Sequence, residues 1–197
     1  MRRDQFQLGV AEADRLIPIE PDNVMWKGLA GQARLELANT LLSLGRVADA
    51  ATEARTGCRL AGQVRVRDPG GAWRHLQTDC VALRSRLALR SASEAEALRL
   101  AELALASARS ERNEDPTRIR YRIAVAQRHL GDVRLRMGDA GAARAAWTAG
   151  LDQLPRNVAE RPAEMFEHAE ILKRLGRADE ALALSSKLKT AGFQSAN

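Results

Sequence analysis

Residues 127–155, QRHLGDVRLRMGDAGAARAAWTAGLDQLP, contain two helical patterns on either side of a glycine. Leu130, Val133 and Met137 recur at helical spacing before Gly138, which predicts an amphipathic helix that ends at the glycine. Glycine suits the left-handed conformation that closes a helix, because it carries no Cβ. Ala143 lies early in the second helix, where a small side chain lets the two helices pack closely. The stretch therefore predicts a helical hairpin.

The glycine–alanine spacing of this hairpin recurs along the chain. Residues 45–50 read GRVADA, residues 138–143 read GDAGAA, and residues 176–181 read GRADEA. The first two are 93 residues apart, which is two steps of 46–47 residues, and SASEAEA at 91–97 lies at the midpoint. The sequence therefore predicts an array of repeated hairpins.

A second marker gives the same period. Trp26 and Trp73 are 47 residues apart, in PDNVMW and DPGGAW, and DPTRIRY at 115–121 continues the series. The Asp-Pro and Pro-Asp pairs supply an N-cap and a first-turn proline, so a long helix is expected to follow each of them. The two markers together place one helix start and one helix turn in each repeat.

The composition favours helices throughout. Hydrophobic residues make up 45% of the 197 residues, whereas aromatic residues make up only 4%. Alanine, leucine and arginine dominate, and the β-branched residues form no alternating runs. No apolar run is long enough to cross a membrane. We expect an all-α protein of about eight or nine helices.

The motifs of residues 127–155 resemble the tetratricopeptide repeat (TPR) family. The matching positions are the Leu-Gly pair, the turn glycine, the close-packing alanine, the large aromatic and the closing proline: Leu130, Gly131, Gly138, Ala143, Trp147 and Pro155. An earlier unit matches at Gly45 and Ala50, and the last unit matches at Gly176 and Ala181. The resemblance implies a right-handed superhelical array of antiparallel helical hairpins, a TPR-like solenoid.

The period of 46–47 residues is longer than the roughly 34 residues of the family. We expect the extra length to extend the first helix of each hairpin and to carry the tryptophans. One repeat domain over 1–197 is expected. It comprises the second helix of a partial repeat (1–20), repeat 1 (21–67), a degenerate repeat 2 (68–114), repeat 3 (115–160) and a terminal repeat (161–197). The array resembles the C-terminal region of a larger bacterial regulatory protein.

The first helices of a TPR array line a concave wall that binds a segment of a partner protein, and the resemblance implies the same surface here. Counting from the turn glycines selects eight polar residues on this wall: Asn39, Arg86, Arg90, Arg128, Asp132, Arg136, Lys173 and Arg174. Arginine binds carboxylates through paired hydrogen bonds, so an acidic partner is expected. The family's lysine–asparagine clamp is not reproduced, because Leu35 stands at the lysine position.

The sequence shows no catalytic or cofactor-binding pattern. His75, His129 and His168 are scattered over three repeats without metal-ligand spacing, and no phosphate-binding glycine loop occurs. Ser186 and Lys189 form an S-x-x-K match that lacks its companion motifs. We expect a protein-interaction scaffold that is not an enzyme and needs neither a metal nor a cofactor.

Two other functions and a simpler explanation of the charge remain open. The net charge of +6 and isoelectric point near 10.1 also fit a nucleic-acid-binding array, although no block of five like charges occurs. The same charge also fits solvated helix faces, and a self-assembly module is the other alternative. Without an apolar signal segment, a cytoplasmic location without membrane insertion is expected, with Cys58 and Cys80 as buried thiols.

Overall fold

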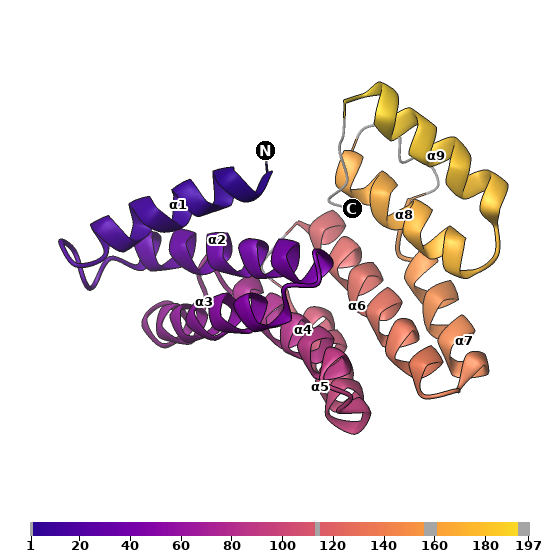
Figure 1. The fold of residues 1–197 in the computed structure, drawn as a ribbon, viewed down its shortest axis with the longest axis horizontal. Helices are drawn as coiled ribbons and strands as arrows, with labels where there is room; N and C mark the ends of the chain where they lie inside the picture. The colour runs from indigo at the N-terminus through magenta and orange to yellow at the C-terminus, as the bar shows by residue number, and fades with distance from the viewer. Residues whose placement is uncertain (1, 113–114, 156–160, 193–197) are drawn as a thin grey trace. The chain divides into compact units, whose positions relative to one another are not determined.

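The computed structural model describes residues 2–112, 115–155 and 161–192. These residues form nine α-helices and no strand, so the predicted all-α class is confirmed for the described part of the chain (Figure 1). The chain divides into two compact units, and the boundary lies between Ser93 and Glu94. This boundary falls within the expected repeat 2, and the five repeat boundaries themselves stay a prediction.

The first unit contains four helices: α1 (Arg2–Leu16), α2 (Val24–Ser43), α3 (Val47–Arg67) and α4 (His75–Arg90). Helices α2 and α3 form a hairpin, α1 packs on α2, and α4 packs on both α2 and α3. Leucines of α2 and α4 and alanines of α3 form the main core of this unit. Leu35, at the position of the family's clamp lysine, belongs to this core and touches Gly57.

The second unit contains five helices: α5 (Glu94–Ser110), α6 (Pro116–Arg136), α7 (Ala140–Leu151), α8 (Pro162–Arg174) and α9 (Ala178–Thr190). The pairs α6–α7 and α8–α9 are hairpins, α5 packs on α6, and α8 packs on α6 and α7. Ala124, Ala143, Trp147 and Ile171 form the core between these hairpins. The hairpins are TPR-like, as predicted from residues 127–155.

The turn glycines adopt the conformation for which they were selected. Gly45, Gly138 and Gly176 have φ of 75°, 86° and 78°, in the left-handed region that favours glycine. In the degenerate repeat, Ala92 occupies the equivalent position with φ of 56°. The same turn geometry therefore persists where the glycine has been replaced.

The other repeat-signature residues also lie where close packing requires them. Ala50, Ala143 and Ala181 are almost completely buried. A Cβ on Gly131 would lie 2.3 Å from the Trp147 ring, so only glycine leaves room for this tryptophan. Leu130 belongs to the buried residues of α6, and Pro155 follows the end of α7 and is exposed.

The expected extension of the first helices is only partly correct. Helices α2 and α6 are 20 and 21 residues long, whereas α4 and α8 have only 16 and 13. Trp26 lies on α2, but Trp73 lies in the turn before α4. Its ring occupies the space beside Gly28, where a Cβ would come within 2.3 Å. Packing of the ring on the preceding helix replaces the extra helical turn.

The expectation of two free thiols is wrong. Cys58 on α3 and Cys80 on α4 form a disulfide, with their Cα atoms 5.3 Å apart. The 22 residues between them in the chain hide this proximity, which arises because α4 packs on α3. The disulfide thus joins two neighbouring helices of the first unit.

Candidate partner-binding surface

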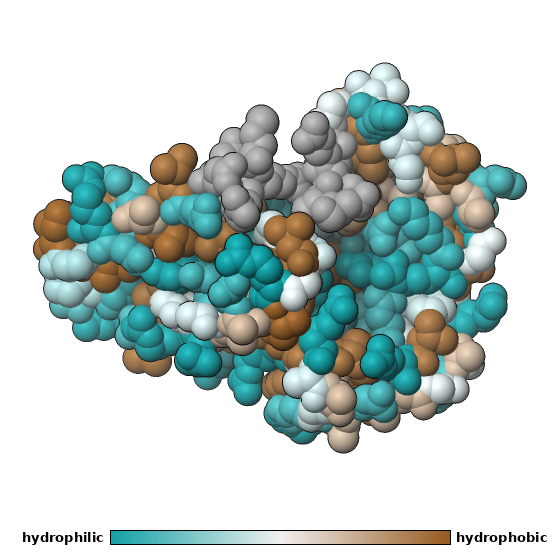
Figure 2. Space-filling view, viewed as in Figure 1, coloured by the Kyte–Doolittle hydropathy of each residue, from teal (hydrophilic) through white to brown (hydrophobic). Residues whose placement is uncertain are grey.

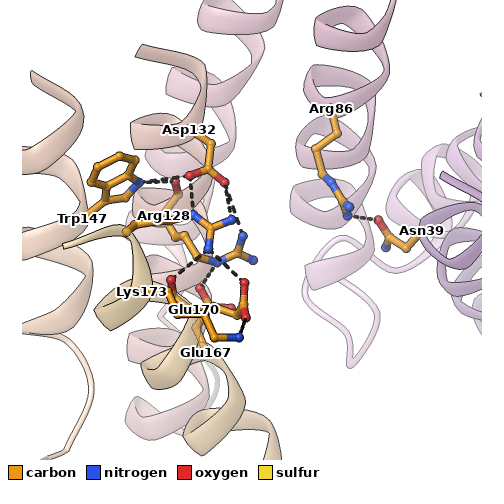
Figure 3. A network of polar contacts seen from close by, with 9 residues as sticks. Asn39, Arg86, Arg128, Asp132, Trp147, Glu167, Glu170 and Lys173 are labelled. Carbon is orange, nitrogen blue, oxygen red and sulfur yellow. Dashed lines mark hydrogen bonds and ion pairs between the residues drawn. The ribbon is translucent and has the colours of Figure 1, made fainter. Parts of the chain in front are cut away.

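The predicted wall residues of the second unit lie on two first helices of hairpins, α6 and α8. Arg128, Asp132 and Arg136 are spaced by four residues, so they form one stripe along α6. Lys173 and Arg174 lie in the last turn of α8, which packs on α6. We call these five residues, together with Glu167 and Glu170 of α8, the α6–α8 cluster (Figure 3).

Arg174 joins the two helices through paired hydrogen bonds. Its Nε and Nη2 donate to the two carboxylate oxygens of Asp132, at 2.5 and 2.9 Å. Its Nη1 also donates to Glu170 at 2.9 Å, and Lys173 donates to the other oxygen of Glu170 at 2.6 Å. Burial opposes the charge of Glu170, but these two cations outweigh it and lower the pKa of the carboxyl group. Glu170 is therefore ionised at neutral pH and holds both cations.

Arg128 occupies the most enclosed position of the cluster. Its Nε donates to Glu167 at 2.5 Å, and the side chain of Glu167 is only 3% exposed. Asp132 lies further away, with 3.6 Å between its Oδ2 and Nη1 of Arg128. Burial works against the charge of Arg128, but the carboxylate of Glu167 outweighs it and raises the pKa of the guanidinium. This arginine is thus permanently charged and held in one position.

Trp147 connects the cluster to the core of the second unit. The indole Nε1 donates to Asp132 at 3.1 Å and to the backbone oxygen of Arg128 at 3.2 Å (Figure 3). Because the ring is packed against Gly131, its N–H orients Asp132 from the buried side. The carboxylate that receives Arg174 is therefore fixed by core packing.

The first unit contains a matching contact between its own first helices. Arg86 on α4 donates to the side-chain oxygen of Asn39 on α2 at 2.6 Å, and the two residues are 47 positions apart (Figure 3). Arg174 and Asp132 repeat this arrangement with a separation of 42. In both units, an arginine of one first helix binds an oxygen acceptor on the preceding first helix. Part of the predicted wall therefore holds neighbouring repeats together.

Two of the selected residues stay available to solvent. Arg90 is exposed, and its side chain forms no hydrogen bond or ion pair with any residue that the structure describes. Arg136 has 65% of its side chain exposed, and its nearest carboxylate is that of Glu94, at 3.8 Å. Lys173 is also 53% exposed despite its contact with Glu170. The exposed cations of the second unit thus border its fixed arginines.

The wall prediction omitted the carboxylates that share the surface. Glu167 and Glu170 were not selected, although Glu170 precedes Lys173 by three residues and Arg174 by four. That spacing is the usual signal for an ion pair within a helix. Glu167 carries no comparable signal, because its partner Arg128 is 39 residues away in the chain.

Over the ranges that the structure describes, no group of three or more histidine, cysteine or acidic side chains could hold a metal ion. Within the same ranges, no helix is both long and apolar enough to span a membrane. On the face shown in Figure 2, hydrophobic residues form separate patches among polar ones.

The chain matches no protein-family model and no curated protein sequence. It is similar in structure to BtubC (BKLC) from P. vanneervenii, with 18% identity, a TM-score of 0.45, and coverage of 96% of this chain and 89% of that one. A crystal structure of MamA gives 14% identity and a TM-score of 0.41, with coverage of 94% and 87%. A second MamA structure gives 16% and 0.42, with coverage of 98% and 88%.

Proposed function

We propose that this chain is a non-enzymatic protein-interaction scaffold whose α6–α8 cluster binds an acidic segment of a partner protein. The proposal is supported by one arrangement above all. Arg128 and Arg174 are held by internal carboxylates, yet 21% and 26% of their side chains remain exposed. Arginines that are already ordered lose little conformational entropy when a ligand binds, so the surface is preorganised.

Exposed hydrogen-bond donors remain for such a partner. Lys173 has three N–H donors and uses one of them on Glu170, and Arg136 forms only a long contact with Glu94. A carboxylate that approached α6 and α8 from solvent would meet these two cations first. The cluster contains four cations and three carboxylates, so hydrogen-bond geometry contributes to recognition along with net charge.

Regulation of a larger bacterial protein is a separate part of this proposal. It is supported only by the resemblance of the repeat pattern. The cytoplasmic location also stays a proposal, and the disulfide argues against it, because such bonds persist mainly in oxidising compartments.

The test measures binding of a capped peptide of ten glutamates, with a peptide of ten glutamines as the neutral comparison, by fluorescence anisotropy. We expect the Arg136→Gln, Lys173→Gln double variant to bind the acidic peptide at least about tenfold more weakly than the unmodified protein. Both residues are mostly exposed, so the variant should melt at the same temperature as the unmodified protein.

A matched control removes the same two charges elsewhere in the second unit. Arg144 on α7 and Lys187 on α9 are exposed, and neither forms an ion pair with a described residue. The Arg144→Gln, Lys187→Gln variant should bind like the unmodified protein. Equal weakening by the two double variants, or equal binding of the glutamine peptide, would overturn the proposal. A concentration-dependent dimer that excludes the peptide would favour self-assembly instead.

A further inference from the structure

A second group of cations lies in the first unit, on α2 and α3. A cavity of about 370 Å³ opens between α1, α2 and α3, and its volume falls within the range of small-molecule sites. The polar lining comes from all three helices: Asp14, Lys27, Arg34, Thr56, Arg59 and Gln63. Two prolines of the α1–α2 connection and two aliphatic side chains complete the wall. The three helices that surround the cavity are labelled in Figure 1.

Arg34 forms the fixed part of this lining. Its Nη2 donates to both oxygens of Asp14, at 2.5 and 2.6 Å, and its Nη1 donates to Glu53 at 2.6 Å. Only 12% of its side chain is exposed. The remaining donor, Nε–H, is buried and has no acceptor in the structure. A buried donor without an acceptor is costly, so a ligand oxygen that reached it would gain a hydrogen bond.

The other two cations of the cavity have no counter-charge. Lys27 is half-buried on α2 and Arg59 is exposed on α3, and neither pairs with a carboxylate among the described residues. Asp14 is the one carboxylate of the lining, and Arg34 occupies both of its oxygens. The cavity thus retains two uncompensated positive charges beside a buried N–H that lacks an acceptor.

We propose that this cavity binds a small organic anion that carries a carboxylate or phosphate group. Lys27 and Arg59 neutralise the anionic group, and Thr56 and Gln63 supply further hydrogen bonds. The apolar part of the ligand lies against Ile17 and Leu60, which the same cavity exposes. This site lies in the first unit and does not depend on the function proposed for the α6–α8 cluster.

The experiment titrates three probes into the ¹⁵N-labelled full chain and follows backbone amides by NMR. Phenyl phosphate and benzoate carry the two anionic groups on the same ring, and benzyl alcohol is the neutral comparison. We expect at least one anion to shift the amides around Thr56 and Gln63 to saturation, and benzyl alcohol to shift them little. The stronger of the two anions identifies phosphate or carboxylate as the preferred group.

The variants test whether the cavity itself recognises the anion. The Lys27→Gln, Arg59→Gln protein should bind the preferred anion at least about tenfold more weakly. The matched control is Arg55→Gln, Arg84→Gln, because both arginines are exposed and unpaired in the described structure and lie outside the cavity lining. This control should change the affinity less than about twofold.

Circular dichroism and thermal melting establish that each variant is folded, and the two single variants serve if the double one is not. Three results would overturn the proposal. They are equal weakening by the control variant, equal binding of benzyl alcohol, and the absence of a saturable shift with either anion.

Discussion

Arg128 lies between two carboxylates, the nearly buried Glu167 and the more exposed Asp132. Removal of the arginine would leave Glu167 charged and without its partner in a site that excludes water. The loss of one member of a buried ion pair is more costly than the loss of the whole pair. The energetic role of this wall residue is therefore to compensate a buried charge.

We expect Arg128→Met to lower the free energy of unfolding by about 3 kcal/mol. Addition of Glu167→Gln should restore a large part of that loss, because no unpaired charge then remains. Urea denaturation of the unmodified protein, both single variants and the double variant gives the coupling energy. If the losses of the two single variants simply add, the two side chains do not interact as described.

At the scale of helices, α3 and α4 are joined by packing and by the Cys58–Cys80 disulfide. The bond closes a loop with a sequence separation of 22 residues, and such a closure stabilises a fold mainly by restricting the unfolded chain. Most of the other described helix pairs are held by apolar and small residues, as between α6 and α7.

Reduction of this disulfide should lower the free energy of unfolding by about 3 kcal/mol. Denaturant titration with and without a phosphine reductant measures the change. The Cys58→Ser, Cys80→Ser protein should have the lower stability and should not respond to the reductant. A thiol assay on the denatured, unreduced protein should detect no free cysteine, and two free thiols per chain would contradict the structure.

At the scale of the whole molecule, the net charge of +6 is spread over faces where many arginines bind the protein's own carboxylates. A cation that is already paired releases few counter-ions when it meets a phosphate backbone, so the salt dependence of nucleic-acid binding should be shallow. The three tryptophans also contribute little to base stacking, since Trp147 is buried and Trp73 is packed beside Gly28.

Binding to single-stranded oligonucleotides or heparin should therefore weaken with salt no more steeply than a log–log slope of about −2, the value for two or three phosphate contacts. Fluorescence anisotropy across a salt series gives the slope. A slope several times steeper would make the nucleic-acid-binding alternative the better account of the basic composition.

The sequence by itself determined the elements and their turns. Gly45, Gly138 and Gly176 could be placed because backbone conformation at a helix end depends on the local residue. Ala143 and Trp147 could be placed because helical periodicity decides which side chains face the neighbouring helix. These are short-range rules, and they were sufficient for the all-α class and the hairpins.

Only the tertiary structure decided which polar groups meet. Arg174 reaches Asp132 across 42 residues, Arg128 reaches Glu167 across 39, and Cys58 reaches Cys80 across 22. The cavity beside Arg34 likewise needs three helices to come together. Electrostatic and covalent partners depend on distances in space, and the residue pattern of one helix does not contain the position of the next. The sequence could therefore select the wall residues, but it could not show that most of them already bind one another.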